Sequence, residues 1–408
     1  MMYNVKKMVA LGAAAVLLAA CSSPDEDGSG GASGPLKIGV LVNTAGALVT
    51  SSEQANIGLK FAADQASEKY GREIELVPIE QDGTAQGAVT AATRLIQQEG
   101  IKIITGSNTT DQGLALGPVV TRLGGVYVDF TAQGNDLTGK GCQAGYFRVT
   151  SNAAAFARLA ATVAKGTEVK KWAFIGSDYG FGRDLEAGLQ DSLAESGSEI
   201  TESVFVPLGS ADYGSYISQL RDDDATGIIV GLAGSDASTF IKQGLQFEVF
   251  DKYESVIGDG FWATLLPEDL PTYAPQMPQA VEIAGLFNDR LDTPEAKEYV
   301  EAYKAAHTGS EASLGGSAPV YSAYQSVSII AQAVADAGTD DVKAVSEALA
   351  SGTFETPAGE VSMRADDHQL LTKGLVSKPE EIDGSWVLNP VEVIEAGDIE
   401  PPLGDCNL

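Results

Sequence analysis

Short apolar segments alternate with longer segments of helical periodicity along most of this 408-residue chain. The first apolar run, Leu36–Val42, is continuous, which is typical of a strand buried on both faces of a parallel sheet. Residues Glu53–Tyr70 follow with apolar side chains at helical spacing. The same strand-then-helix order repeats with short loops as far as Phe130. Such repetition predicts a right-handed parallel α/β layer.

A second series of strands and helices follows, from Phe156 to Ile257. Two series in tandem predict an α/β fold of two doubly wound lobes. Later helices and the short strands expected between Val361 and Val387 would return to complete both lobes, which makes a multi-crossing hinge. We therefore expect lobe 1 to comprise residues 36–148 plus about 291–360, and lobe 2 residues 149–290 plus about 361–408.

The N-terminus has the three parts of a secretory signal peptide. Lys6 and Lys7 precede an apolar run of 13 residues, Met8–Ala20, which is shorter than the roughly 20 residues that span a bilayer. The segment ends in Leu-Ala-Ala-Cys21, which resembles the lipobox of bacterial lipoproteins. That resemblance implies removal of residues 1–20, lipidation of Cys21 and anchoring on the extracytoplasmic face of a membrane. Residues 21–35 are rich in Gly, Ser and acidic side chains and are expected to form a flexible tether.

The charge and the cysteine content exclude several classes of partner. The formal net charge is −30, and so acidic a chain repels nucleic acid and anionic headgroups. Two histidines and few cysteines leave no set of ligands for a transition metal, and no cofactor is expected. Cys142 and Cys406 form either a disulfide, as is usual for an even pair in an exported chain, or two free thiols.

The sequence carries no arrangement of catalytic residues. No Gly-x-Ser-x-Gly, His-Glu-x-x-His or Cys-x-x-Cys motif occurs. Gly134–Lys140 matches the start of a phosphate-binding loop, but Gly141 stands where Ser or Thr should bind magnesium. We therefore expect a binding protein rather than an enzyme.

The loops that follow the predicted parallel strands should meet at one edge of each sheet and face a cleft between the lobes. In lobe 1 they are polar and small, and the loop before the helix near Gln112 suits a carboxylate because helix N-termini bind anions. In lobe 2 they carry acids and aromatic residues, which suit an ammonium group and an apolar side chain. The candidate ligand-binding residues are Asn108, Thr109, Thr110, Thr131, Ala132, Gln133, Tyr179, Ser235, Asp259 and Phe261.

Several of these segments, in their order and spacing, resemble a known family. The markers are Lys37-Ile-Gly-Val, Gly58-Leu-Lys-Phe-Ala, Asp178-Tyr-Gly-Phe-Gly and Val320-Tyr-Ser-Ala-Tyr-Gln. They are similar to the branched-chain amino acid (Leu/Ile/Val) binding proteins of ABC importers, and the similarity extends from Leu36 to Val387. It implies a type I periplasmic binding fold.

The resemblance also implies roles for particular residues. In lobe 1, Thr109, Thr110, Thr131 and Gln133 would hold the carboxylate of an amino acid. In lobe 2, Tyr179 would face the ligand, and Asp259 lies within one residue of the place of the acid that takes the ammonium. Gln133 stands where the family usually has Ser or Thr, and Phe261 would suit a larger or aromatic ligand.

The resulting hypothesis is a lipid-anchored, monomeric protein that delivers a small polar solute to an ABC permease and ATPase complex. One alternative is a sensory module of the same fold that signals through a partner receptor. Another is a binder of an aromatic acid or amide instead of an amino acid, and a surface hydrolase has no support from the motifs.

Overall fold

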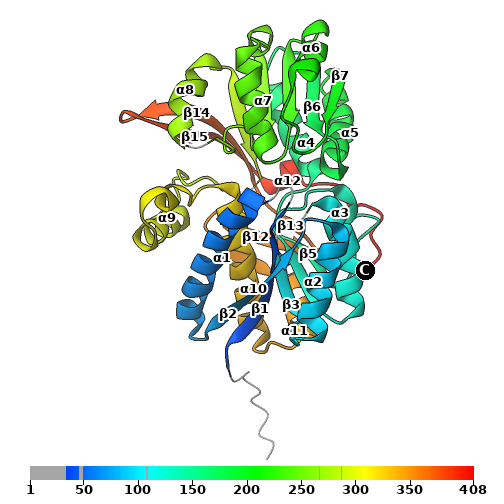
Figure 1. The fold of residues 1–408 in the computed structure, drawn as a ribbon, viewed down its shortest axis with the longest axis vertical. Helices are drawn as coiled ribbons and strands as arrows, with labels where there is room; N and C mark the ends of the chain where they lie inside the picture. The colour runs from blue at the N-terminus through cyan, green and yellow to red at the C-terminus, as the bar shows by residue number, and fades with distance from the viewer. Residues whose placement is uncertain (1–33, 46–48, 107–108, 266, 286) are drawn as a thin grey trace, which may run out of the picture. The chain divides into compact units, whose positions relative to one another are not determined.

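The computed structural model describes residues 34–45, 49–106, 109–265, 267–285 and 287–408 (Figure 1). The predictions for the signal peptide, for nearly all of the tether, for Cys21 and for Asn108 lie outside these residues. The described residues form one compact unit.

Sheet A has eight strands in the order β11-β12-β13-β5-β4-β3-β1-β2. Its strands β1 to β5 pair in parallel, as the alternating sequence pattern predicts. The buried pattern of the first strand shows why: its apolar side chains are covered on both faces. The strands are β1 (Leu36–Asn43), β2 (Ile74–Gln81), β3 (Ile103–Gly106), β4 (Val126–Asp129), β5 (Tyr146–Arg148), β11 (Thr353–Thr356), β12 (Gly359–Arg364) and β13 (Gln369–Leu371).

Sheet B has seven strands in the order β15-β14-β10-β9-β8-β6-β7. Its first five strands along the chain are parallel, and β14 and β15 add an antiparallel hairpin at one edge. The strands are β6 (Lys171–Ser177), β7 (Glu199–Val206), β8 (Gly227–Gly231), β9 (Ser255–Asp259), β10 (Ala280–Ala284), β14 (Gly374–Ile382) and β15 (Ser385–Ile394).

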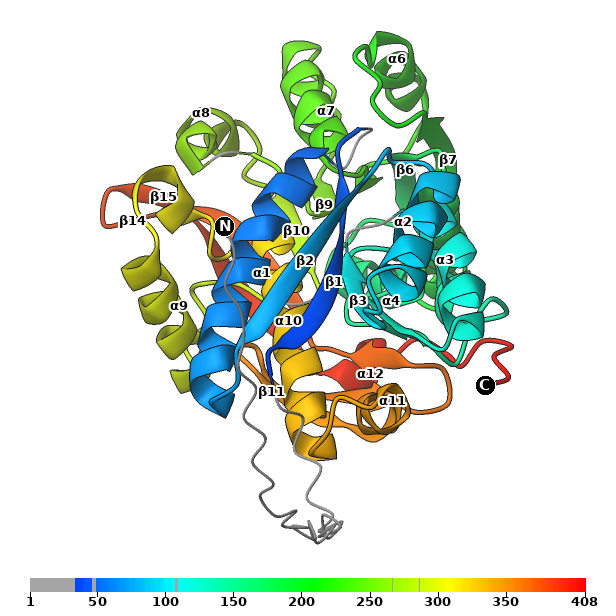
Figure 2. The ribbon, with the colours of Figure 1, turned by 60° about the horizontal axis from the view of Figure 1, so that its bottom comes forward.

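Helices cover both faces of each sheet (Figures 1 and 2). Sheet A is covered by α1 (Val49–Tyr70), α2 (Ala85–Gln97), α3 (Thr110–Arg122), α10 (Ala318–Ala337) and α11 (Val342–Ser351). Sheet B is covered by α4 (Ala153–Lys165), α5 (Gly180–Ala194), α6 (Gly214–Asp222), α7 (Ser235–Gln246) and α8 (Leu270–Tyr273). The remaining elements are α9 (Pro294–Ala306), α12 (Ala396–Ile399) and the 3-10 turns η1 (Asn135–Thr138), η2 (Phe250–Lys252), η3 (Pro267–Asp269), η4 (Ala274–Gln276) and η5 (Gly309–Ser313).

Each sheet separates two apolar cores, as expected of a doubly wound layer. In sheet A, Ile38 and Val40 face a core shared with α1 and α10, while Leu41 faces a core shared with α2 and α3. We call sheet A with its helices lobe 1 and sheet B with its helices lobe 2. Within the described ranges, none of the helices is long and apolar enough to cross a membrane.

The division between the lobes near the C-terminus differs from the expected one. Residues from about 361 onward were expected in lobe 2, but β12 and β13 are strands of sheet A. The return is fixed by pairing of β13 with β5, where the Arg148 N–H donates to the His368 carbonyl at 3.0 Å. Of the strands after residue 358, β14 and β15 belong to sheet B, so the chain passes between the sheets after Leu371.

The predicted multi-crossing hinge is confirmed, and its crossings converge on one side chain. The chain passes between the sheets after β5, after β10 and after β13. Ser151, on the first crossing, donates to the carbonyl of Gly285 on the second at 3.1 Å. Its hydroxyl also lies 2.9 Å from that of Thr372 on the third. This contact ties the three crossings together at the hinge.

Candidate functional site

The first turn of α3 lies on the lobe 1 side of the candidate site and is fixed by hydrogen bonds at its N-cap. Thr109 is its N-cap: the Gln112 N–H donates to Thr109 Oγ1 at 3.4 Å, and the Thr109 N–H donates to Gln112 Oε1 at 2.9 Å. This reciprocal capping box fixes the start of the helix. The half-buried Thr109 hydroxyl accepts in this box and keeps its own proton available for donation.

Thr110 lies where lobe 1 meets lobe 2. Its side chain is 2% exposed, and its hydroxyl accepts a hydrogen bond from the Gly134 N–H at 3.2 Å. A Cβ atom on Gly180, at the start of α5, would lie 2.9 Å from Thr110 Cγ2. The absence of a side chain at position 180 therefore lets the starts of α3 and α5 come together.

Asp129, which was not among the predicted residues, holds the loop that follows β4. It is fully buried, and its Oδ1 accepts from the N–H groups of both Thr131 and Ala132 at 2.9 Å. The Tyr146 hydroxyl donates to Oδ2 at 2.8 Å. The only signal in the sequence was an acid at the last position of a buried strand.

The predicted residues on this loop lie in different environments. The Thr131 and Gln133 side chains are half-buried, whereas Ala132 is 2% exposed and packs in the lobe 1 core. The Gln133 carbonyl accepts from the Ala153 N–H at 2.8 Å, which joins the loop to the start of α4 in lobe 2.

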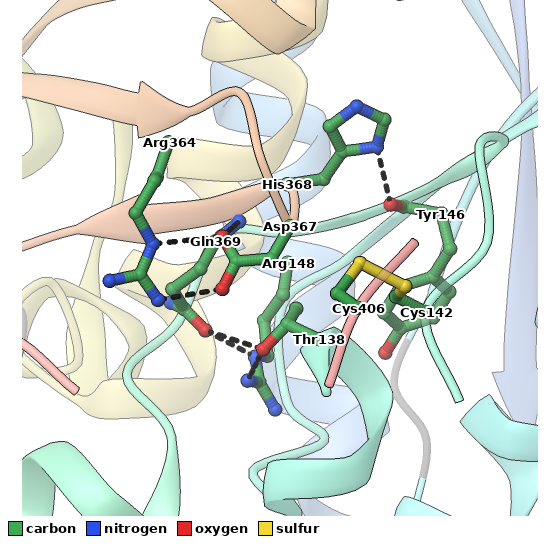
Figure 3. Close-up of a disulfide and its surroundings, with 9 residues drawn as sticks. All are labelled: Thr138, Cys142, Tyr146, Arg148, Arg364, Asp367, His368, Gln369 and Cys406. Atoms are coloured by element: carbon green, nitrogen blue, oxygen red, sulfur yellow. Dashed lines mark hydrogen bonds and ion pairs between the residues drawn. A yellow bond between two sulfur atoms is a disulfide. The ribbon is translucent and has the colours of Figure 1, made fainter. Parts of the chain in front are cut away.

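Arg148, also missed by the sequence analysis, fixes the next part of the loop (Figure 3). Its guanidinium is fully buried and donates to the Gly134 carbonyl at 2.5 Å, to Gln369 Oε1 at 2.7 Å and to the Thr138 hydroxyl. No pattern around position 148 predicts this role, because the guanidinium joins the preceding loop, at Gly134 and Thr138, to Gln369, which lies 221 residues further along the chain.

On the lobe 2 side, Tyr179 is the N-cap of α5 and is half-buried against Phe181. Burial raises the pKa of its phenol, and the negative charges of Asp259, Asp236 and Asp111 raise it further. Asp111 belongs to α3 of lobe 1, so acids from both lobes surround this hydroxyl.

Asp259 is the last residue of β9, and Asp236 lies in the first turn of α7, after the neighbouring strand β8, but the two acids differ in their hydrogen bonding. The Gly209 N–H donates to both Asp236 oxygens, at 3.2 and 3.0 Å. Asp259 receives no hydrogen bond or ion pair at its carboxylate from the described part of the chain, and burial raises its pKa to about 7. Ser235, the first residue of α7, is exposed.

The structure places Phe261 in the apolar core of lobe 2. Its ring is fully buried, 6.0 Å from the ring of Phe250 and 5.1 Å from that of Trp262. Beneath this turn the buried Glu282 accepts from the Ala263 N–H at 2.7 Å. Burial raises the pKa of Glu282 to about 8, and the charge of Asp259 contributes in the same direction.

Cys142 and Cys406 form a disulfide with Cα atoms 5.6 Å apart (Figure 3). Of the two alternatives left open by the sequence, the bonded pair is therefore confirmed. The bond closes 264 residues of chain and attaches the C-terminal segment to lobe 1.

A profile of the periplasmic binding proteins matches residues 35–379. The chain belongs to this family. Leu/Ile/Val-binding protein homolog 6 of Brucella suis biovar 1 (strain 1330) is 24% identical over 376 residues, which cover 89% of this chain and 90% of the relative. Homolog 3 of Brucella melitensis biotype 1 is 26% identical over 337 residues, which cover 79% and 86%.

Solved structures of this fold are similar over nearly the whole described chain. An amino acid ABC transporter substrate-binding protein from Pseudomonas fluorescens Pf-5 gives a TM-score of 0.78 at 22% identity, with 92% of this chain and 99% of that one covered. A solute-binding protein of an ABC transporter from R. palustris, in complex with 4-hydroxybenzoate, gives 0.78 at 20% identity, with 88% and 97% covered. The type I periplasmic binding fold is thus confirmed. As a member of the periplasmic binding protein family, the protein acts outside the cytoplasm and is not an enzyme.

Proposed function

We propose that this protein is the lipid-anchored component of an ABC importer and that its solute is an amino acid bound between the two lobes. The start of α3, with Thr109 and Thr110, and the loop bearing Thr131 and Gln133 would receive the carboxylate. Tyr179 and Asp259 would receive the ammonium. Ligand contacts with both lobes would shift the hinge equilibrium toward a closed form that the permease recognises.

The observation that carries this proposal is the state of Asp259. A partly buried carboxylate without a partner in the described residues is costly unless a cation reaches it. The ammonium of an amino acid is such a cation, and Tyr179 beside it offers an aromatic ring and a hydroxyl. A ligand that carries only a carboxylate would instead be repelled by Asp259.

The burial of Phe261 also argues for an amino acid over an aromatic acid. The Phe261 ring, which suggested an aromatic ligand, packs in the lobe 2 core, so we leave it out of the proposed ligand set. Ser235 and Ala132 are left out as well, because one is exposed and the other packs in the lobe 1 core. The helix start at Thr109 provides the anion site that either ligand would need.

Titration calorimetry with pairs of ligands that differ only in the ammonium tests the proposal. We expect leucine or phenylalanine to bind, and the deaminated analogue of the same side chain to bind roughly 30-fold more weakly or worse, as for loss of one partner of a buried charge pair. Binding of 4-hydroxybenzoate without binding of any amino acid would support the aromatic-acid alternative. Sensing instead of transport would be indicated if a ligand binds but no permease accepts the loaded protein.

The anchor is tested separately in cells. Replacing Cys21→Ser should move the protein from the membrane fraction to the soluble exported fraction, because stable attachment depends on the lipid chains. Ser22→Ala, the adjacent change, should leave it membrane-bound. We also propose that the protein is a monomer, which light scattering of the detergent-free Cys21→Ser form would measure.

A further inference from the structure

The segment after β15 begins as part of lobe 2. β15 ends at Ile394 in sheet B, and α12 packs directly after it on α4. Ile399 is 2% exposed and belongs to the apolar core that contains Leu159 of α4. Up to residue 399 the C-terminal segment is therefore held by lobe 2.

The next two residues are held by lobe 1. Arg364 of β12 donates from Nη1 to Glu400 Oε1 at 2.8 Å and to the Pro401 carbonyl at 2.7 Å. Asp367, whose side chain is 1% exposed, fixes the same guanidinium with bonds of 3.0 and 2.6 Å (Figure 3). Ile399 and Glu400 are consecutive, with Cα atoms about 3.8 Å apart, so the segment crosses between the lobes without slack.

A disulfide then attaches the end of the C-terminal segment to lobe 1. Cys406 is bonded to Cys142, which lies four residues after η1. The loop that contains η1 follows β4 and carries Thr131 and Gln133 near its start. It contacts lobe 2 where the Asn135 N–H donates to the Asp184 carboxylate at 2.7 Å. The C-terminal segment thus ends on the loop that carries the proposed lobe 1 ligand groups.

The same segment packs against two of the three chain crossings of the hinge. A cavity of about 10 Å³ is lined by Ser151 of the first crossing, Thr372 of the third, and Ile399 and Glu400. That volume is close to the space of a single water molecule, so the segment fits closely against the hinge.

We propose that residues 395–406 form a fourth connection between the lobes, and that Arg364 and the Cys142–Cys406 bond act through it as positioning residues for the loop 131–142. The connection restricts how far the lobes separate in the ligand-free protein. Its effect on ligand affinity rests on the proposed function, whereas its effect on lobe separation does not.

The restriction has a thermodynamic consequence for binding. If the fourth connection is released, more of the ligand-free population is open, and the fraction competent to close falls. The apparent Kd rises in proportion to that loss. The closed, ligand-bound form is unchanged, because the contacts of the ligand are unchanged.

Two independent variants test the proposal in the full chain. Arg364→Gln removes the clamp on residues 400 and 401 and leaves the disulfide, while the double variant Cys142→Ser/Cys406→Ser removes the bond and leaves the clamp. Arg72→Gln is the matched control, because Arg72 pairs at 2.6 Å with Asp340 inside lobe 1. Small-angle X-ray scattering without ligand reports lobe separation, and calorimetry reports Kd.

We expect both test variants to increase the radius of gyration of the ligand-free protein and to regain the wild-type value at saturating leucine. We expect their Kd to rise roughly three- to tenfold, with the control unchanged. Ligand-free scattering equal to that of wild type in Arg364→Gln would overturn the proposal, even if the double serine variant fails to fold. Failure of the wild type to bind any amino acid would contradict the proposed function alone, since the scattering needs no ligand.

Discussion

The two lobes differ in whether the polar groups that they bring to the proposed site already have hydrogen-bond partners. In lobe 1 these groups are already engaged: Thr109 caps α3, and Asp129 holds the N–H groups of Thr131 and Ala132. In lobe 2, Asp259 has no partner within the described residues and resists ionisation. The difference indicates that lobe 1 is organised before the solute arrives. Lobe 2 instead carries an unfavourable charge that the solute would relieve on closure, which makes closure depend on ligand.

Removing the lobe 2 charge should have the largest effect. Asp259→Asn keeps the size of the side chain but leaves a ligand ammonium without its counter-charge, so we expect a loss of roughly 2–5 kcal/mol of binding free energy. Calorimetry with leucine measures the change. Asp224→Asn, which removes an exposed lobe 2 acid that pairs with Lys171, should leave Kd unaltered. Equal affinities in the wild type and Asp259→Asn would remove Asp259 from the site.

Lowering the pH should reproduce that loss reversibly. Burial raises the pKa of Asp259 to about 7, so the carboxyl is ionised above this pH and neutral below it, while the ligand ammonium stays charged. Affinity should therefore fall as the pH drops through 7, by about 30-fold between pH 8 and pH 5.5. The Asp259→Asn variant should show a flat profile over the same range. A sloping profile in that variant would assign the titration to another group, of which Glu282 is the nearest candidate.

Weakening the hydrogen bonds of Asp129 in lobe 1 should have a smaller effect, and it should lower both the free energy of unfolding and the affinity for the ligand. Asp129→Asn weakens charge-assisted bonds to the Thr131 and Ala132 N–H groups, worth roughly 1.5 kcal/mol of folding free energy. We expect a lower urea midpoint and a weaker Kd together. Asp64→Asn, on the exposed face of α1, provides the control. A loss of stability with unchanged Kd would mean that the loop needs no support from Asp129 to bind.

The same contrast explains what could be predicted from the sequence. Strand and helix order followed from apolar periodicity, because parallel strands and their covering helices are local patterns. Thr109 was found because a capping residue precedes its own helix. Asp129 and Arg148 were missed because each joins the loop after β4 to a side chain of another strand, Tyr146 and Gln369 respectively. β13 was assigned to the other lobe because its pairing with β5 decides its sheet. Phe261 was predicted to contact the ligand because it follows a buried strand in a loop expected to face the cleft, but its ring packs on Phe250, a contact that adjacent residues do not reveal.

The smallest expected effect tests whether the organised state of lobe 1 itself contributes to affinity. Thr109→Ala removes the hydroxyl that caps α3, at a cost of about 1 kcal/mol in helix stability, whereas Thr109→Ser keeps the hydroxyl and both bonds of the capping box. If the helix start receives the ligand carboxylate, Ala should weaken binding and Ser should restore it, as measured by calorimetry at pH 8, where Asp259 is ionised. A deaminated ligand that still binds should lose a similar factor in Thr109→Ala, because the carboxylate end is shared. Equal Kd values for the Ala and Ser variants would show that the Thr109 hydroxyl makes no contribution to binding. The contrast between the lobes would then rest on the Asp259 charge, not on the Thr109 hydroxyl.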